Sequence, residues 1–137
     1  MVKIITGQIG EGKTKWLIRT ANEQLSSLKG HAVYIDSNSD HRYELSHQIR
    51  LIEAGHFSLH TPSSFIAFLC GILSTNHDIE VIFIDELCKL THCKLEEIAD
   101  YCEAILKLSN EHEVDFIIGT SCSKKDLPHH LSPYFVA

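Results

Sequence analysis

The sequence predicts an α/β protein, a three-layer α/β/α sandwich built on a mainly parallel sheet of about five strands. Short runs of consecutive apolar residues, such as residues 81–84, are typical of strands buried on both faces. These runs alternate with longer segments whose apolar residues recur every three or four positions, as in amphipathic helices. Such an alternation favours parallel strands joined by helices that cover both faces of the sheet.

Each element is indicated by its own pattern. Apolar runs predict strands over residues 2–6, 32–36, 80–85 and 114–118, and the short segment 56–60 could form a further strand. Helical spacing predicts helices over residues 13–29, 42–54, 65–73 and 95–109. The first helix should end at Lys29 and Gly30, because a basic residue and a glycine are typical of a helix C-terminus. The run Thr61-Pro62-Ser63-Ser64 should supply a turn and the cap of the third helix.

Length and composition are those of one ordinary domain. The chain has 137 residues, 44% of them hydrophobic and 22% charged, which argues against disorder and against a membrane-embedded protein. No apolar run approaches the roughly 20 residues that a membrane-spanning helix needs, and no leader pattern follows Met1. We therefore expect a single cytoplasmic domain over residues 1–137.

The cysteines argue against a secreted disulfide-rich protein, and the net charge argues against general binding of nucleic acid. Five cysteines at irregular spacing are typical of reduced thiols, and a net charge of −6 gives no general attraction for a nucleic-acid backbone. Cys88, His92 and Cys93, together with Cys122 or the pair His129-His130, could form a zinc site. Their spacing fits no common zinc pattern, so thiols and histidines without a metal are favoured.

A glycine-rich motif between the first predicted strand and helix carries the main functional signal. Residues 7–14 match G-x-x-x-x-G-K-[ST] in full. Glycines let the backbone turn its N–H groups towards one anion at a helix N-terminus, so the motif predicts a site for the phosphates of a nucleoside triphosphate. The residues expected around the phosphates are Gly7, Gln8, Ile9, Gly10, Glu11, Gly12, Lys13 and Thr14.

Two side chains of this motif have specific expected roles. Lys13 should reach the β and γ phosphates as a catalytic residue, and the Thr14 hydroxyl should bind Mg²⁺. Glu11 stands at a free position, where its negative side chain should point away from the phosphates. The chain has no Asn-Lys-x-Asp run of the kind that recognises guanine, which favours ATP as the nucleotide.

A second motif, a pair of acidic residues, stands at the end of the strand predicted over residues 80–85. We expect this strand to lie beside the phosphate-binding segment in the sheet, with Asp85 binding Mg²⁺ and Glu86 activating a water. Thr120 and Ser121 follow the last strand, where their hydroxyls are candidate sensors of the γ phosphate. An ordinary turn at the end of a strand is the alternative for this pair.

Arginines are few, and all of them precede Asp85: Arg19, Arg42 and Arg50. An arginine that stabilises charge in phosphoryl transfer must therefore come from this first half of the chain, from a neighbouring copy or from a partner protein. Lys124 and Lys125 are the local substitutes.

The order of these motifs resembles the RecA-like core of the P-loop NTPases, over nearly the whole chain. The matching segments are the Walker A run 7–14, Tyr34-Ile35-Asp36, Thr61-Pro62-Ser63, the Walker B strand end Ile84-Asp85-Glu86, and Gly119-Thr120-Ser121. This resemblance implies a Mg²⁺-dependent ATP-binding core. The second RecA-like domain of helicases, with its arginine motif, has no counterpart here.

The chain is also similar, through shorter matches, to the ATP-binding half of the thymidine kinase family. The matches are the phosphate-binding segment, Asp40-His41-Arg42-Tyr43 and the Ile-Asp-Glu strand end. In that family a zinc-stapled lasso holds the nucleoside, and no paired C-x-x-C elements follow Ser121 here. That departure argues against a nucleoside kinase.

Three functions remain open. The first is an ATPase that hydrolyses the β–γ phosphoanhydride and acts through a homo-oligomer or a protein partner. The second is a small-molecule kinase, with an acceptor bound near Glu86 as the base. The third is a non-catalytic switch in which ATP orders a segment such as residues 40–50 or 124–131.

Overall fold

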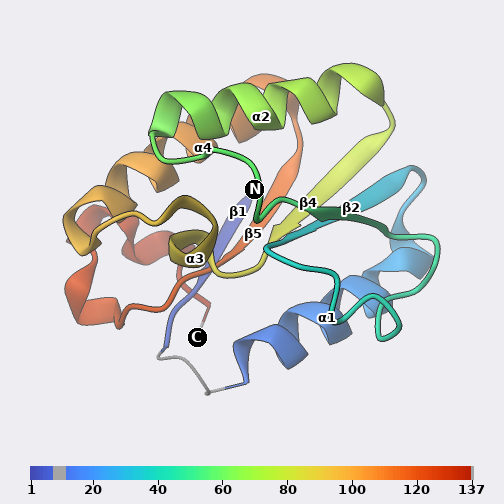
Figure 1. Ribbon diagram of the computed structural model, residues 1–137, viewed down its shortest axis with the longest axis horizontal. Coiled ribbons are helices and arrows are strands. Elements are labelled where there is room, and N and C mark those ends of the chain that lie inside the picture. Colours follow the sequence, from blue (N-terminus) through green and yellow to red (C-terminus); the bar gives the residue numbers. More distant parts are fainter. Residues whose placement is uncertain (8–11, 137) are drawn as a thin grey trace.

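Five parallel strands form one sheet in the computed structural model, which describes residues 1–7 and 12–136 (Figure 1). The strands are β1 (Val2–Ile5), β2 (His31–Asp36), β3 (Arg50–Glu53), β4 (Ile79–Ile84) and β5 (Asp115–Gly119). Their order across the sheet is β1-β5-β4-β2-β3, and every pair of neighbours is parallel. The predicted α/β class and the parallel sheet of five strands are confirmed.

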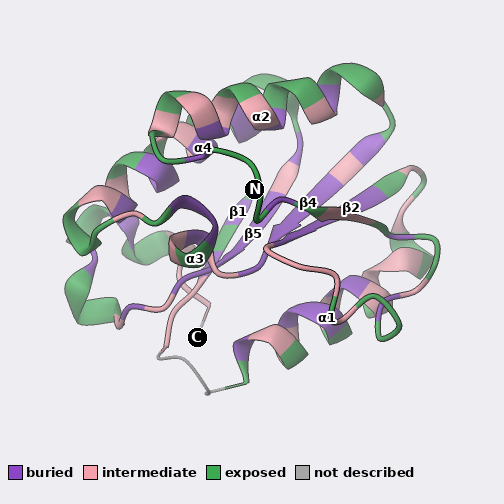
Figure 2. Ribbon diagram, viewed as in Figure 1, coloured by how far each residue is buried: buried purple, intermediate pink, exposed green. Residues whose placement is uncertain are grey.

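Helices cover both faces of this sheet. They are α1 (Lys13–Gln24), α2 (Pro62–Thr75), α3 (Leu87–Thr91) and α4 (Ile98–His112). Figure 1 shows α1 on one face and α2 and α4 on the other. Alternate residues of a strand serve the two faces: in β4, Ile82 packs in the core cluster that includes α2 and α4, whereas Phe83 packs in the cluster that includes α1. The inner strands β2, β4 and β5 are therefore buried on both sides, as their mainly purple ribbons in Figure 2 show, whereas β3 at the edge of the sheet has no fully buried residue.

The predictions of the second helix and of a further strand at residues 56–60 are wrong. Residues 40–44 form turns, the strand β3 replaces the end of the expected helix, and residues 56–60 contain no strand. Leu45, Ile49 and Ile52 have helical spacing, yet Leu51 packs in the α1-side cluster and Ile52 against the opposite one, which is the alternation of a strand. Pairing with β2 outweighed the local pattern.

The prediction that β4 lies directly beside β1 in the sheet is also wrong, because β5 lies between them. Patterns of apolar residues identify a buried strand but do not say which strand pairs with it. Both strands nevertheless end at the same edge of the sheet, since all five run in the same direction.

The segment after β5 runs back along the outer edge of β1. The Val136 N–H donates to the Ile4 carbonyl at 3.0 Å, and Ile4 and Phe135 form an isolated bridge. Leu131, in the short 3-10 helix His129–Tyr134, is fully buried. This segment therefore covers the edge strand that lies next to the glycine-rich motif.

No helix within residues 1–7 and 12–136 combines the length and apolar character that crossing a membrane requires.

The cap at the start of α2 lies within the predicted run 61–64, and the structure assigns it to Thr61, so that the helix begins at Pro62. The Thr61 hydroxyl accepts the Ser64 N–H at 3.1 Å, and the Ser64 hydroxyl accepts the Thr61 N–H at 3.2 Å.

Substitution Thr61→Ala should lower the free energy of unfolding by about 1 kcal/mol, because the N–H of Ser64 loses its acceptor. Urea denaturation measures this, with Thr61→Ser as the control that keeps the hydroxyl. Equal stabilities of Thr61→Ala and Thr61→Ser would contradict it.

Candidate functional site

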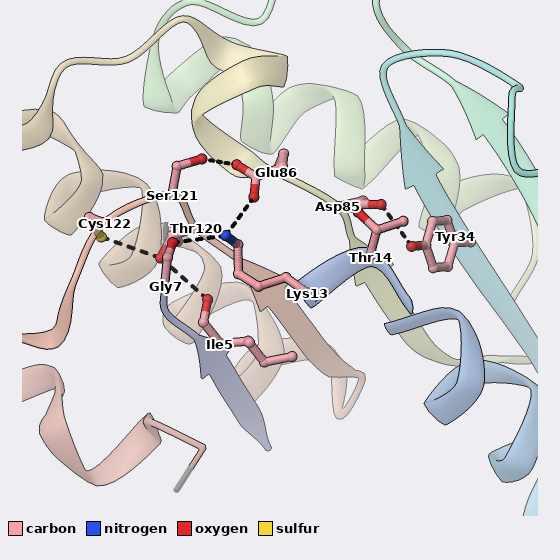
Figure 3. A network of polar contacts seen from close by, with 10 residues as sticks. All are labelled: Ile5, Gly7, Lys13, Thr14, Tyr34, Asp85, Glu86, Thr120, Ser121 and Cys122. Carbon is pink, nitrogen blue, oxygen red and sulfur yellow. Dashed lines mark hydrogen bonds and ion pairs between the residues drawn. The ribbon is translucent and has the colours of Figure 1, made fainter. Parts of the chain in front are cut away.

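The carboxyl ends of three strands meet the N-terminus of α1 at one edge of the sheet. Gly7 follows β1, Asp85 and Glu86 follow β4, and Ser121 follows β5. Figure 3 shows Glu86, Ser121 and Gly7 around the end of the Lys13 side chain and Asp85 beside Thr14; Lys13 is the first residue of α1. Gln8, Ile9, Gly10 and Glu11, the remaining residues of the predicted phosphate-binding run, lie outside the described residues.

The ammonium group of Lys13 is buried among oxygen atoms of two strand ends. The Lys13 Nζ donates to the Gly7 carbonyl at 2.8 Å and lies 3.3 Å from Glu86 Oε1, with only 6% of the lysine side chain exposed. The other carboxylate oxygen of Glu86 accepts a hydrogen bond from the Ser121 hydroxyl (Figure 3). The three contacts place a positive charge, a carboxylate and a hydroxyl in one continuous network.

Asp85 is held from both sides beside this network. Thr14 Oγ1 donates to Asp85 Oδ1 at 3.2 Å, and the Tyr34 hydroxyl donates to Asp85 Oδ2 at 2.9 Å. Burial, followed by the charge of Asp36, raises the pKa of Asp85, and the two hydrogen bonds oppose this shift. Burial and Asp85 together raise the pKa of Tyr34, so its hydroxyl remains a donor. The orientation of the carboxylate is therefore well defined.

Asp36 is a third carboxyl group at this edge, to which the sequence analysis gave no role of its own. It ends β2, is 7% exposed and accepts the Ser37 N–H at 2.7 Å. Burial raises its pKa, and Ser37, His41 and Lys89 oppose this shift only in part. An apolar run that ends in an acid, as before Asp85, was the signal that could have identified it. The charge of Asp36 in turn disfavours ionisation of Asp85, whose pKa it raises.

The backbone around Lys13 and Glu86 has unusual conformations. Gly7 has φ 142° and Gly12 has φ 81°, which favour glycine, whereas Glu86 has φ 55° without being glycine. A left-handed conformation costs a residue such as glutamate on the order of 1 kcal/mol, and such residues concentrate at functional sites. This backbone turn starts α3 and places the Glu86 carboxylate next to Lys13.

Two cavities meet at Gly12 and Lys13. The larger one, about 830 Å³, is lined by Thr14, Glu86 and Ser121 and continues to Lys15, His41 and Lys89. The smaller one, about 330 Å³, includes Trp16, Lys124 and Val136. Both volumes fall in the range of roughly 300 to 1,000 Å³ that small-molecule sites occupy. The described arginines, Arg19, Arg42 and Arg50, line neither cavity.

The two candidate sensor residues lie differently. Thr120 is fully buried, and its hydroxyl donates to the Ile5 carbonyl at 3.4 Å, which connects β5 to β1. Ser121 lines the larger cavity and contacts Glu86. Of the pair, Ser121 is the one whose hydroxyl reaches the site.

The zinc alternative gains no support. Within residues 1–7 and 12–136, no three His, Cys, Asp or Glu side chains are grouped so that they could hold a metal ion. The His92 ring packs edge-on against the His60 ring with centroids 5.1 Å apart. A hydrogen bond with Cys88 lowers the pKa of the Cys93 thiol to about 7. These thiols contact each other.

Comparisons with protein-family models and with curated proteins found no match for this chain. What the site does has to be inferred from its own chemistry. That chemistry combines a buried ammonium, a helix N-terminus, a hydroxyl-carboxylate pair and a second carboxylate at the wall of a cavity. A polyanion with a divalent cation is the ligand that such a combination suits.

The buried Asp36 makes a prediction about pH. Because its pKa is raised in the folded protein, ionisation of Asp36 destabilises the fold, and stability from this group is lost as the pH rises through the folded-state pKa. Substitution Asp36→Asn should therefore raise the melting temperature at pH 7–8 by a few degrees, about 1 kcal/mol. The gain should disappear below about pH 4, where the carboxyl is protonated in both states.

Calorimetry at several pH values measures this effect. The matched control is Asp40→Asn, because Asp40 is exposed in the connection that follows β2. A melting temperature of Asp36→Asn that stays equal to that of the unsubstituted protein from pH 4 to 8 would show that the buried charge costs nothing.

Proposed function

We propose that this protein binds a nucleoside triphosphate, expected to be ATP, together with Mg²⁺ and hydrolyses its β–γ phosphoanhydride. On this proposal it is a P-loop NTPase with a RecA-like core. The observation that carries the proposal is that Lys13, Thr14 and Glu86 line one cavity, with Asp85 hydrogen-bonded to Thr14. These are the residues for which the sequence predicts these roles.

The phosphates would bind at the N-terminus of α1. This helix has 12 residues and no acidic residue in its first turn, so the dipole at its N-terminus favours an anion there. The Lys13 ammonium would exchange the Gly7 carbonyl and Glu86 for phosphate oxygens. Since the ammonium already lies beside Glu86, the γ phosphate would be placed next to that carboxylate.

The described residues fit a magnesium ion. Mg²⁺ prefers oxygen ligands at about 2.0–2.1 Å in an octahedron and keeps several waters, so it needs few protein oxygens. Thr14 Oγ1 and Asp85 Oδ1 are 3.2 Å apart, close to the separation of about 3 Å between adjacent octahedral ligands. When bound, Mg²⁺ offsets the charge of the β and γ phosphates.

Glu86 would act as the general base. Its side chain is 18% exposed and lines the larger cavity, where a water can reach it. The water oxygen would attack the γ phosphorus as the bond to the bridging oxygen breaks, with the bridging electrons leaving on ADP and the water proton passing to Glu86. The Ser121 hydroxyl keeps the carboxylate oriented.

The negative charge of the transferred phosphoryl group would be only partly compensated by the isolated chain. Lysines line the larger cavity, and the described arginines do not. An arginine supplied by a second copy or by a partner raises such rates by roughly 10³ to 10⁵. We therefore propose that the protein works through an oligomer or a partner and that the isolated chain turns over slowly.

Removing the ammonium tests the binding step. In wild type, MgATP at 100 times its Kd should stabilise the fold by about 2.7 kcal/mol, because it binds only the folded form. Lys13→Ala should lose this stabilisation, whereas Lys3→Ala, an exposed lysine of β1, should keep it. Thermal shifts with ATP, GTP and ADP, each with and without Mg²⁺, measure this. A wild-type shift retained in Lys13→Ala would refute the assigned phosphate site.

Neutralising Glu86 separates binding from hydrolysis. Glu86→Gln keeps the shape and an acceptor for Ser121 but cannot take a proton, so single-turnover hydrolysis should fall by about 10² to 10⁴. Affinity for MgATP should stay the same or rise, because the ion pair that holds Lys13 is gone and a negative charge near the phosphates is removed. Hydrolysis at the wild-type rate would instead show that Glu86 is not the catalytic base.

One observation favours a small-molecule kinase as the second candidate. The larger cavity continues past Glu86 to Lys15, His41 and Lys89, groups that hydrolysis does not need. An acceptor hydroxyl in that part would reach the same base. ADP release that rises at least several-fold on adding nucleosides, with a phosphorylated product found by mass spectrometry, would support the kinase over the ATPase.

A further inference from the structure

The smaller cavity lies at the edge of the sheet beside β1. It shares Gly12 and Lys13 with the larger cavity but is not lined by Thr14, Glu86 or Ser121. β1 is the outer strand of the sheet on this side. The two cavities therefore extend from Lys13 in different directions, and only the larger one is lined by Thr14, Glu86 and Ser121.

Three distant parts of the chain build the walls of the smaller cavity. Ile5 and Thr6 come from the end of β1, and Trp16 comes from the first turns of α1. The Trp16 side chain is partly buried and packs against the core cluster on the α1 side. Val136 is fixed by its hydrogen bond to the Ile4 carbonyl, and Lys124 begins a short 3-10 helix after β5. The cavity thus has an aromatic wall, aliphatic walls and an ammonium group.

We propose that this cavity holds the nucleobase of the bound nucleotide, stacked on the Trp16 ring, with Val136 across from it and the Lys124 ammonium towards the ribose and the α phosphate. The inference rests on the proposed triphosphate site. Because Lys13 contacts Glu86 and Thr14 contacts Asp85, the γ phosphate belongs on their side. The nucleoside at the other end of the phosphate chain must then leave Lys13 in the other direction, towards Trp16.

The physical case is the match between a flat ring and this wall. An aromatic side chain stacks with any base because every base has a π face, and Trp offers the largest such surface. The alternative is that Trp16 only completes the core of α1. If Trp16 had only this structural role, changing it would lower stability and would weaken the binding of a nucleotide and of inorganic triphosphate to the same extent.

Fluorescence provides the first test, because Trp16 is the single tryptophan of the chain. Titration with MgATP should quench its emission. Inorganic triphosphate with Mg²⁺ should bind, as calorimetry measures, without comparable quenching. Identical fluorescence changes for the two ligands, or ATP binding in calorimetry without any change, would overturn the proposed base site.

Two substitutions provide the second test. Trp16→Leu keeps apolar bulk without a π face and should weaken MgATP binding on the order of tenfold, whereas Trp16→Phe should weaken it less than about threefold. The affinity for inorganic triphosphate should be unchanged in both variants. Circular dichroism checks that both are folded.

The two proposals fail in different ways. Equal weakening of ATP and inorganic triphosphate by Trp16→Leu would show a structural role for the ring and overturn the base site alone. If wild type binds neither ligand, the triphosphate site has failed and the base site falls with it.

Discussion

The ammonium group of Lys13 links the ends of two strands that are not neighbours in the sheet. It contacts the Gly7 carbonyl after β1 and the Glu86 carboxylate after β4, while β5 runs between these strands. A charge this deeply buried has to be compensated by acceptors, so the strand ends and the start of α1 are constrained together. The Thr14–Asp85 and Ser121–Glu86 contacts depend on this arrangement, since Thr14 follows Lys13 in α1 and Glu86 is the shared acceptor.

Two carboxyl groups at this edge of the sheet are buried, and burial makes their ionisation unfavourable. Asp36 and Asp85 end adjacent strands, and burial raises the pKa of both. Two carboxylates held near each other disfavour their own ionisation and favour a cation. Perturbed groups of this kind concentrate at functional sites, although ion-pair networks also produce them. In this chain the perturbed carboxylates and the strained backbone of Glu86 occur at the same edge of the sheet.

Long-range contacts also shape the outer side of the site. The segment after β5 lies against β1 through Phe135 and Val136, which places Val136 and Lys124 near the first turns of α1. On our proposals, catalysis occupies one side of Lys13 and base recognition the other. The two sides are then built from different segments, so that changes at Trp16 and at Glu86 act on separate properties of the same nucleotide.

The sequence by itself determined the parallel α/β class, most of the helices and strands and the run of motif residues, because local spacing of apolar residues reflects the periods of helix and strand. It failed at residues 42–54, where Leu45 and Ile49 mimic a helix. Only the tertiary structure decided the position of β5 between β1 and β4, the bond of Tyr34 to Asp85 and the place of Asp36 beside them. The reason is physical: strand order and side-chain partners depend on contacts between segments distant in the chain, and no local pattern encodes them.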